Sequence, residues 1–147
     1  MIWVEPQPTI FQRLQSNIQT CPNQQAFQYL LSDTDHKKYD FHITDNQGES
    51  SSLFLLKDHA KMFPHVHLSH RISLTSTTFD TFIQSEHINI TDYDVLVLDT
   101  QGSELLILKG AKEVLSHFTY IQVEVADFEA YEGCCLLHEI HEYLLSA

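Results

Sequence analysis

Apolar residues recur at helical spacing in three parts of the chain. The first part lies between Pro8 and Pro22, and Pro8 suits the first turn of a helix because its missing N–H would have no partner there. The second part follows Gly102, and the third lies near the end of the sequence. The apolar positions that define these three predicted helices are Ile10, Leu14 and Ile18; Leu105, Leu108 and Leu115; and Leu137, Ile140 and Leu144.

Between the helical stretches the pattern becomes that of β-strands. Residues 39–43 and 71–75 alternate apolar and polar side chains, which predicts half-exposed strands. A turn at 45–48 would let residues 53–56 return antiparallel to the first of these. Residues 95–98 are apolar on both faces, which is typical of a central strand in a parallel sheet. The remaining predicted strands are the apolar runs 2–4, 26–31 and 120–125.

This alternation of strands and helices predicts the α/β class, with a mostly parallel sheet flanked by helices. The length of 147 residues suits one domain, 1–147, and the 43% of hydrophobic residues are sufficient for a globular core. No apolar run is long enough to cross a bilayer, and the first residues lack a basic, cleavable leader. Three cysteines do not form a disulfide framework, so we expect a reducing, cytoplasmic setting.

The charge of the chain narrows the range of partners. Twenty acidic residues against eight basic ones give a formal net charge of −12. Such a surface repels nucleic-acid phosphates and anionic lipids, so we expect neither nucleic acid nor membrane as a partner. A cationic ligand would be compatible with it, although a solvated acidic face is the more common reason for an acidic excess.

Four of the predicted strands carry an acidic residue at or near their carboxyl ends. In an open parallel sheet these ends form one rim, at which ligands bind. A carboxylate there can accept hydrogen bonds from both hydroxyls of a ribose, and a second one from an adenine amino group. Acids at strand ends also serve as turn formers and helix caps, so each one alone has a structural interpretation. The four residues are Glu5, Asp33, Asp99 and Glu124.

The chain contains ten histidines, and two groups have spacings that could suggest metal ligands. These groups are His65, His67 and His70, and then His138 with His141. No cysteine lies near the first group, and the second lacks the i, i+4 spacing by which a helix presents two zinc ligands. We therefore expect solvent-facing histidines and no metal site. The adjacent Cys134 and Cys135 are expected to pack against the sheet as inert thiols.

Several short segments, taken in order, resemble those of FkbM-family methyltransferases, and the resemblance extends from Ile2 to about Leu144. Its most specific part is the D-x-Q-G-x-E segment that begins at Asp99, followed by a K-G-A segment. The segments are Val4-Glu5-Pro6-Gln7-Pro8, Leu31-Ser32-Asp33, Asn46-Gln47-Gly48-Glu49-Ser50-Ser51-Ser52, Thr77-Thr78-Phe79-Asp80, Leu98-Asp99-Thr100-Gln101-Gly102-Ser103-Glu104, Leu108-Lys109-Gly110-Ala111 and Val123-Glu124-Val125.

The resemblance implies the class I methyltransferase fold, which is Rossmann-like, and S-adenosylmethionine as methyl donor. It also implies O-methylation of a hydroxyl on a sugar, a glycan or another small metabolite. By position, Glu5 matches the family's ribose-binding acid, and Ser32 with Asp33 matches the segment that flanks the adenine. Asp99 and Gln101 match the motif beside the donor and the acceptor. Asp99 as the catalytic base is a hypothesis from chemistry, because a sugar hydroxyl needs a base to accept its proton.

The sequence departs from the family pattern at its start. A class I methyltransferase begins with a strand and a glycine-rich loop of the kind D-x-G-A-N-x-G, and none of the four glycines here lies early enough to form it. In that fold the absent strand lies between the strands that end at Glu5 and Asp99, and the final two strands are also missing. The strands that end at Glu5 and Asp99 would then pair directly with each other, recruit another chain, or border a gap. Unpaired strand edges would favour a homo-oligomer.

Three interpretations of function remain open at this point. The first is an active methyltransferase, in a chain that is a fragment of a longer gene product. The second is a catalytically inactive remnant of such an enzyme, which serves as a binding or interaction module. The third is a nicotinamide dinucleotide enzyme, because an acid after the second strand occurs there too. The third is the weakest, since the D-x-Q-G-x-E segment has no role in a dinucleotide-binding fingerprint.

Overall fold

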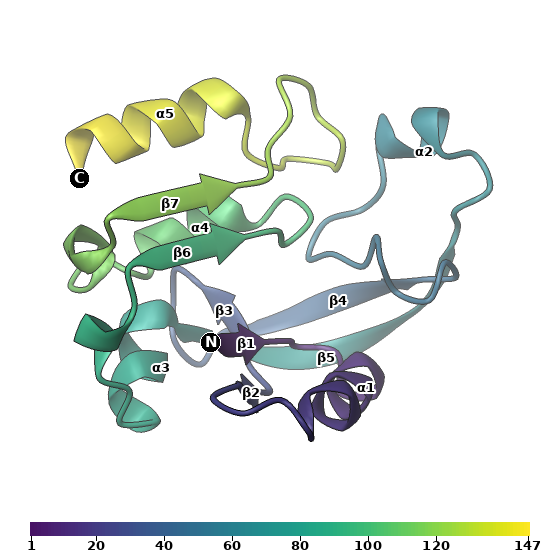
Figure 1. Cartoon of the computed structure of the whole chain (residues 1–147). Coiled ribbons are helices and arrows are strands. Elements are labelled where there is room, and N and C mark those ends of the chain that lie inside the picture. The colour runs from purple at the N-terminus through teal and green to yellow at the C-terminus, as the bar shows by residue number, and fades with distance from the viewer.

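The computed structural model describes residues 1–147 and has a mixed α/β fold (Figure 1). The strands are short, apart from β4 and β5, and no helix is longer than α1. The elements are β1 Ile2–Val4, α1 Pro8–Ile18, β2 Gln25–Phe27, β3 Leu30–Ser32, β4 Lys38–Thr44, α2 His59–Met62, β5 Leu68–Thr78, α3 Phe79–Ser85, β6 Val95–Leu98, α4 Glu104–Lys109, β7 Tyr120–Val123 and α5 Leu137–Ser146, with single 3₁₀ turns at Ile90–Asp92 and Leu115–His117.

The strands form three small sheets rather than the one continuous sheet that we expected. β1 pairs with β2, β3 pairs with β5, and β6 pairs with β7, and all three pairings are parallel. β4 and β5, the two long strands in Figure 1, pair antiparallel. Most of the strand pairs are therefore parallel, as expected, but they do not belong to a single sheet. β1 and β6, which end just before Glu5 and Asp99, do not pair with each other.

Two predicted strands differ from the structure. The predicted strand 26–31 is interrupted at Gln28 and Tyr29, so that β2 and β3 join different sheets. The apolar run extends through the interruption, because Tyr29 also packs in the core, where its ring centroid lies 5.1 Å from that of Phe82. Residues 53–56 do not return beside β4 as a strand, although β5 pairs with only one edge of β4. Only one antiparallel bridge, between His42 and Ser52, remains of that pairing.

The prediction of a central position for β6 was wrong. β6 pairs only with β7, and its exposure alternates along the strand. Val95 and Val97 are 52% and 58% exposed, whereas Leu96 and Leu98 are buried. β6 therefore has apolar residues on both faces, but other parts of the chain cover only the face that carries Leu96 and Leu98.

The main core lies on the covered face of β6. It joins Leu96 and Leu98 to buried side chains of α3, α4 and α5, among them Phe82, Leu108 and Ile140. α4 is shorter than predicted and ends at Lys109, so Leu115 contributes to the core from the following 3₁₀ turn. A second, smaller core lies under the β4–β5 ladder.

A glycine allows α4 to approach β3 closely. A Cβ atom on Gly110 would lie 2.2 Å from the carbonyl oxygen of Ser32, a backbone atom that cannot rotate away. This contact joins the sheet that carries β3 to the helix that follows Asp99, and it explains the glycine in the K-G-A segment.

Every helix of the structure is too short or too polar to traverse a membrane.

Candidate functional site

Two of the predicted carboxylates lie side by side because of the pairing of β6 with β7. The last paired residues of the two strands are Leu98 and Val123, so Asp99 and Glu124 follow at adjacent positions on the same rim. The backbone N–H of Glu124 donates to the carbonyl oxygen of Leu98 at 2.8 Å, which extends the ladder by one residue. Hydrogen bonding between the two carboxyl groups raises the pKa of Glu124, and burial and the charge of Asp99 raise it further.

The side chain of Gln101 joins these two carboxylates. Its Nε2 donates to Oδ1 of Asp99 at 2.7 Å and to Oε2 of Glu124 at 3.1 Å. Its Oε1 accepts a hydrogen bond from the hydroxyl of Tyr131 at 2.6 Å, which fixes the orientation of the amide. Burial raises the pKa of Tyr131 to about 12, so this hydroxyl keeps its proton and remains a donor at neutral pH. The backbone of Gln101 has a φ of 56°, a left-handed conformation that is unusual for a residue other than glycine or asparagine.

A buried carboxylate holds the loop that carries Asp99 and Gln101. Glu104 is 1% exposed, and its Oε1 accepts hydrogen bonds from the backbone N–H groups of Thr100 at 2.8 Å and Gly102 at 3.1 Å. A carboxylate that binds two backbone donors makes strong, directional bonds. Glu104 therefore shapes the site. The pattern of acids at strand ends does not predict this role, although Glu104 is the last residue of the D-x-Q-G-x-E segment.

The carboxyl ends of β1 and β6 border a cavity of about 540 Å³, which we call the first cavity. Glu5, Asp99 and Gln101 line it, so the structure brings together three of the predicted site residues. The Glu5 carboxylate is largely buried and accepts a hydrogen bond at Oε1 from the backbone N–H of Gln7, at 2.7 Å. Burial raises the pKa of Glu5, and the bond from Gln7 opposes this only in part.

A glycine turn forms another part of the wall of the first cavity. Gln47, Gly48 and Glu49 line the cavity together with Gln7. Gly48 has a φ of +86°, and a Cβ atom on it would lie 2.7 Å from Oε1 of the Gln7 side chain. The N-Q-G segment therefore uses glycine both for its backbone conformation and for close approach to the residues after β1.

Two predicted site residues do not line the first cavity. Ser32 is fully buried, and its hydroxyl contacts Oδ1 of Asp33 at 3.2 Å and the hydroxyl of Tyr39 at 3.1 Å. Asp33 is exposed and also accepts a hydrogen bond from the hydroxyl of Thr34. The residue immediately before them, Leu31, does line the cavity.

A second cavity of about 570 Å³ lies across Gln101 from the first, because Gln101 lines both. Glu124 and Tyr131 line this second cavity, whereas Asp99 lines only the first. The other walls come from the segment around α2 and from residues 126–135. Further lining residues are Glu49, Ser50, His59, Met62, Phe63, His65, Phe128, Ala130, Cys134 and Cys135.

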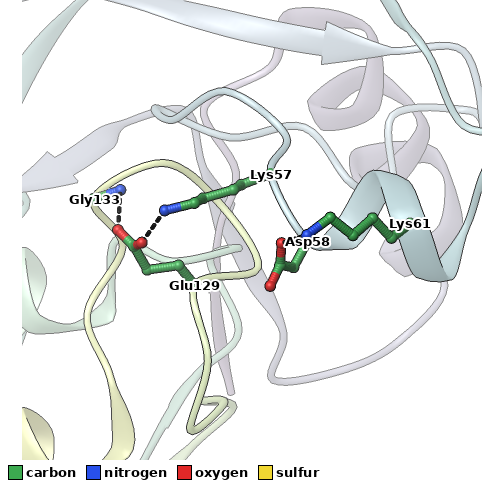
Figure 2. Close-up of polar contacts among 5 residues, drawn as sticks. All are labelled: Lys57, Asp58, Lys61, Glu129 and Gly133. Carbon is green, nitrogen blue, oxygen red and sulfur yellow. Dashed lines mark hydrogen bonds and ion pairs between the residues drawn. The ribbon is translucent and has the colours of Figure 1, made fainter.

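Backbone and side-chain contacts hold these two walls of the second cavity together. The backbone N–H of Lys57 donates to the carbonyl oxygen of Ala130 at 3.0 Å, and an isolated antiparallel bridge joins Leu56 to Tyr131. Figure 2 shows the ion pair between Lys57 and Glu129, whose carboxylate also accepts the N–H of Gly133 at 3.1 Å. Segments more than seventy positions apart in sequence therefore form one edge of the cavity.

The histidines do not gather into a cluster. No group of three or more histidine, cysteine, aspartate or glutamate side chains has an arrangement that could hold a metal ion. His138 and His141 are exposed on α5. Cys134 and Cys135 are buried and unpaired, and burial raises the pKa of Cys135 to about 11. At neutral pH Cys135 is therefore a protonated thiol rather than a nucleophile.

Comparison with known proteins identifies relatives of the whole chain. The family model described as "Methyltransferase FkbM domain" matches residues 1–147. The chain is 27% identical over 148 aligned positions to the "2-O-methyltransferase NoeI" of Sinorhizobium fredii (strain NBRC 101917 / NGR234). The alignment covers 97% of this chain and 60% of that relative, so the chain spans about three fifths of the relative's length. No solved structure matches the chain significantly.

Proposed function

The chain belongs to the FkbM methyltransferase family, and on that premise we propose that it transfers a methyl group from S-adenosylmethionine to a hydroxyl of a sugar or another small metabolite. The name of the relative, a 2-O-methyltransferase, supports oxygen as the methylated atom. The observation that carries the proposal is that Glu5 and Asp99, from two different sheets, line the same cavity as Gln101. In this proposal the parallel strand pairs belong to a class I, Rossmann-like methyltransferase fold.

The residues of the first cavity suit the proposed donor. A volume of about 540 Å³ lies within the usual range of sites for small molecules and cofactors. Oε1 of Glu5 is held by the backbone of Gln7, and the carboxylate keeps further acceptor capacity for the hydroxyls of a ribose. Asp33, which is exposed two positions after the lining residue Leu31, would flank the adenine, and the buried Ser32 would support it through its hydroxyl. Asp99 places negative charge where a cationic sulfur would be stabilised.

The carboxylates of the site have two tasks in methyl transfer. S-adenosylmethionine supplies a methyl group on a positively charged sulfur, and alignment with the acceptor provides much of the acceleration. The donor would give its methyl group to the acceptor oxygen and keep the electron pair of the broken carbon–sulfur bond, and a carboxylate of this chain would accept the hydroxyl proton. Asp99 is the proposed base, and Gln101 holds its Oδ1 in place.

Binding and turnover measured on the same variants would test this function. We expect calorimetry to detect S-adenosylmethionine binding to the chain, and we expect Glu5→Gln to weaken it by about tenfold, since this equals about 1.4 kcal/mol of lost hydrogen bonding. Asp99→Asn should lower methyl transfer to hydroxylated sugars far more than donor affinity. Asp94→Asn is the matched control, because Asp94 is exposed just before β6 and makes no side-chain hydrogen bond.

Two outcomes would contradict the proposal. Absence of binding at millimolar S-adenosylmethionine would remove the first cavity as a donor site. Unchanged turnover in Asp99→Asn would remove Asp99 as the base while leaving the donor assignment intact.

A further inference from the structure

The second cavity has a composition that selects one kind of ligand. Acidic side chains line it, and lysine and arginine are both absent from its lining. Its three acids have different environments: Glu49 and Glu124 are exposed, whereas Glu104 is buried and bound to backbone N–H groups. A phosphate or carboxylate ligand would therefore meet negative charge and find no lysine or arginine to pair with. The cavity suits a ligand that carries no negative charge and donates hydrogen bonds.

Aromatic rings form an apolar part of the wall of the same cavity. The ring of His59 packs on Tyr131 with centroids 5.3 Å apart, and on Phe63 with centroids 4.8 Å apart. Tyr131 is buried beneath His59, whereas Phe63 is 43% exposed. Such faces bind the C–H side of a saturated ring, while polar groups at the edge bind its substituents. The combination of a ring-stacking wall with carboxylate acceptors is therefore suited to a sugar.

His59 adds no positive charge to this wall. Its Nε2 lies 3.1 Å from the hydroxyl of Ser50, but its Nδ1 is buried without a hydrogen-bond partner. A protonated imidazole would carry an N–H at both positions and would leave one of them unsatisfied. Burial lowers the pKa of His59, and nearby His65 lowers it further, so the ring is neutral at neutral pH.

Gln101 connects the second cavity to the first. The single amide nitrogen of Gln101 bonds Asp99, which lines the first cavity, and Glu124, which lines the second. A hydroxyl bound by Glu124 would therefore lie across one side chain from the donor cavity. The hydroxyl of Tyr131 fixes this amide from the second cavity.

We propose that the second cavity is the acceptor site and that its acceptor is a neutral sugar ring without phosphate, bound by Glu124 and stacked on the accessible rings of His59 and Phe63. This inference rests on the proposed function and adds the place and the charge of the acceptor. Glu124 binds a hydroxyl of the sugar ring, and Tyr131 is a positioning residue that acts through Gln101. The −12 net charge of the chain disfavours anionic acceptors in the same direction.

The binding test uses a panel of methyl hexopyranosides and the corresponding hexose 1-phosphates, observed by saturation-transfer NMR with the full chain. We expect the neutral glycosides to bind at least tenfold more tightly than the phosphates. Glu124→Gln should weaken glycoside binding at least tenfold and change S-adenosylmethionine affinity, measured by calorimetry, by less than twofold. Equal or tighter binding of the phosphates, or no binding by any glycoside, would overturn the proposal.

The positioning role of Tyr131 has its own test. Tyr131→Phe should lower kcat for methyl transfer with little change in donor affinity, because the ring remains while the bond to Gln101 is lost. Tyr143→Phe is the matched control, since its hydroxyl bonds the carbonyl oxygen of Leu108 in the core. Equal effects of the two variants on kcat would indicate a merely structural role for Tyr131.

The two proposals fail in distinguishable ways. If S-adenosylmethionine binds and methyl transfer occurs, but Glu124→Gln changes neither glycoside affinity nor KM, the acceptor site is wrong and the function stands. If S-adenosylmethionine does not bind, the donor assignment is wrong, whatever the glycosides do.

Discussion

Replacing Glu104 should loosen the loop that carries Asp99 and Gln101. The Glu104 carboxylate accepts two backbone hydrogen bonds, from Thr100 at 2.8 Å and from Gly102 at 3.1 Å. Bonds to a charged acceptor contribute about 1.5–3 kcal/mol each and neutral ones about 0.5–1.5 kcal/mol. Glutamine keeps the oxygen but removes the charge, which loses about 2 kcal/mol over two bonds. Relief of the buried charge offsets part of this, so we expect Glu104→Gln to destabilise by about 1–2 kcal/mol.

Alanine at position 104 should have a larger effect because both N–H donors lose their partner. Each unsatisfied donor costs about 1–3 kcal/mol, and these two are only partly buried, so we expect about 2–4 kcal/mol in total. For a chain of 147 residues the unfolding entropy is about 0.3 kcal/mol/K, so the two variants should lower Tm by about 3–6 °C and 6–13 °C.

Urea denaturation and thermal unfolding by circular dichroism would measure these differences. Glu142→Gln is the control, because Glu142 is exposed on α5 and makes no side-chain hydrogen bond. Both Glu104 variants should also bind S-adenosylmethionine more weakly than the control, since the loop lines the first cavity. If Glu104→Ala unfolds within about 0.5 kcal/mol of the unsubstituted chain, the loop is held by other contacts and the reasoning is refuted.

Three other predictions follow from single contacts. Gly110→Ala should destabilise by about 1–3 kcal/mol, because its Cβ would lie 2.2 Å from the carbonyl oxygen of Ser32; an unchanged Tm would show that α4 can shift freely. The raised pKa of Glu124 means that the folded chain binds more protons than the unfolded chain above about pH 4.5, so stability should fall as pH rises through the raised pKa. Glu124→Gln should therefore gain stability relative to the unsubstituted chain between pH 4 and pH 7, and an equal difference at both pH values would contradict repulsion by Asp99. Cys135, with a pKa of about 11, should resist iodoacetamide at pH 7.5 in the folded chain and react only after unfolding, as mass spectrometry would show.

Periodicity alone was sufficient to predict several elements. The fourfold spacing of Ile10, Leu14 and Ile18 gives α1, which starts at Pro8 as expected. The alternation within 39–43 gives β4, because half-exposed strands keep a strict period of two. These elements are set by local pattern, and pairing partners do not alter them.

The errors concern partners that lie far away in sequence. Residues 26–31 are a continuous apolar run, and only the pairing of β3 with β5, more than forty positions later, divides the run between two sheets. Residues 95–98 have the composition of a central strand, but composition does not reveal that β6 has a single neighbour. Strand order depends on long-range contacts, which a local pattern does not encode.

For the candidate site as well, local sequence features were predictable and contacts with distant segments were not. Strand-end position predicted that Glu5 and Asp99 would lie close together, and both line the first cavity although their strands belong to different sheets. The roles of Tyr131 and Gly48 were missed, since each acts through a partner on a distant segment. Glu104 was within reach of the sequence: a glutamate at the start of a helix, just after a loop, is a common acceptor for exposed backbone N–H groups.

Because the amide of Gln101 is shared between two cavities, a ligand bound in either cavity should change the ligand affinity of the other. Its nitrogen has two carboxylate partners and its oxygen has one hydroxyl partner, so any ligand that competes for one of these bonds changes the strength of the rest. Thermodynamic linkage then requires reciprocity: whatever factor the first ligand applies to the affinity of the second, the second applies to the first. Order of addition would matter for rate but not for this factor.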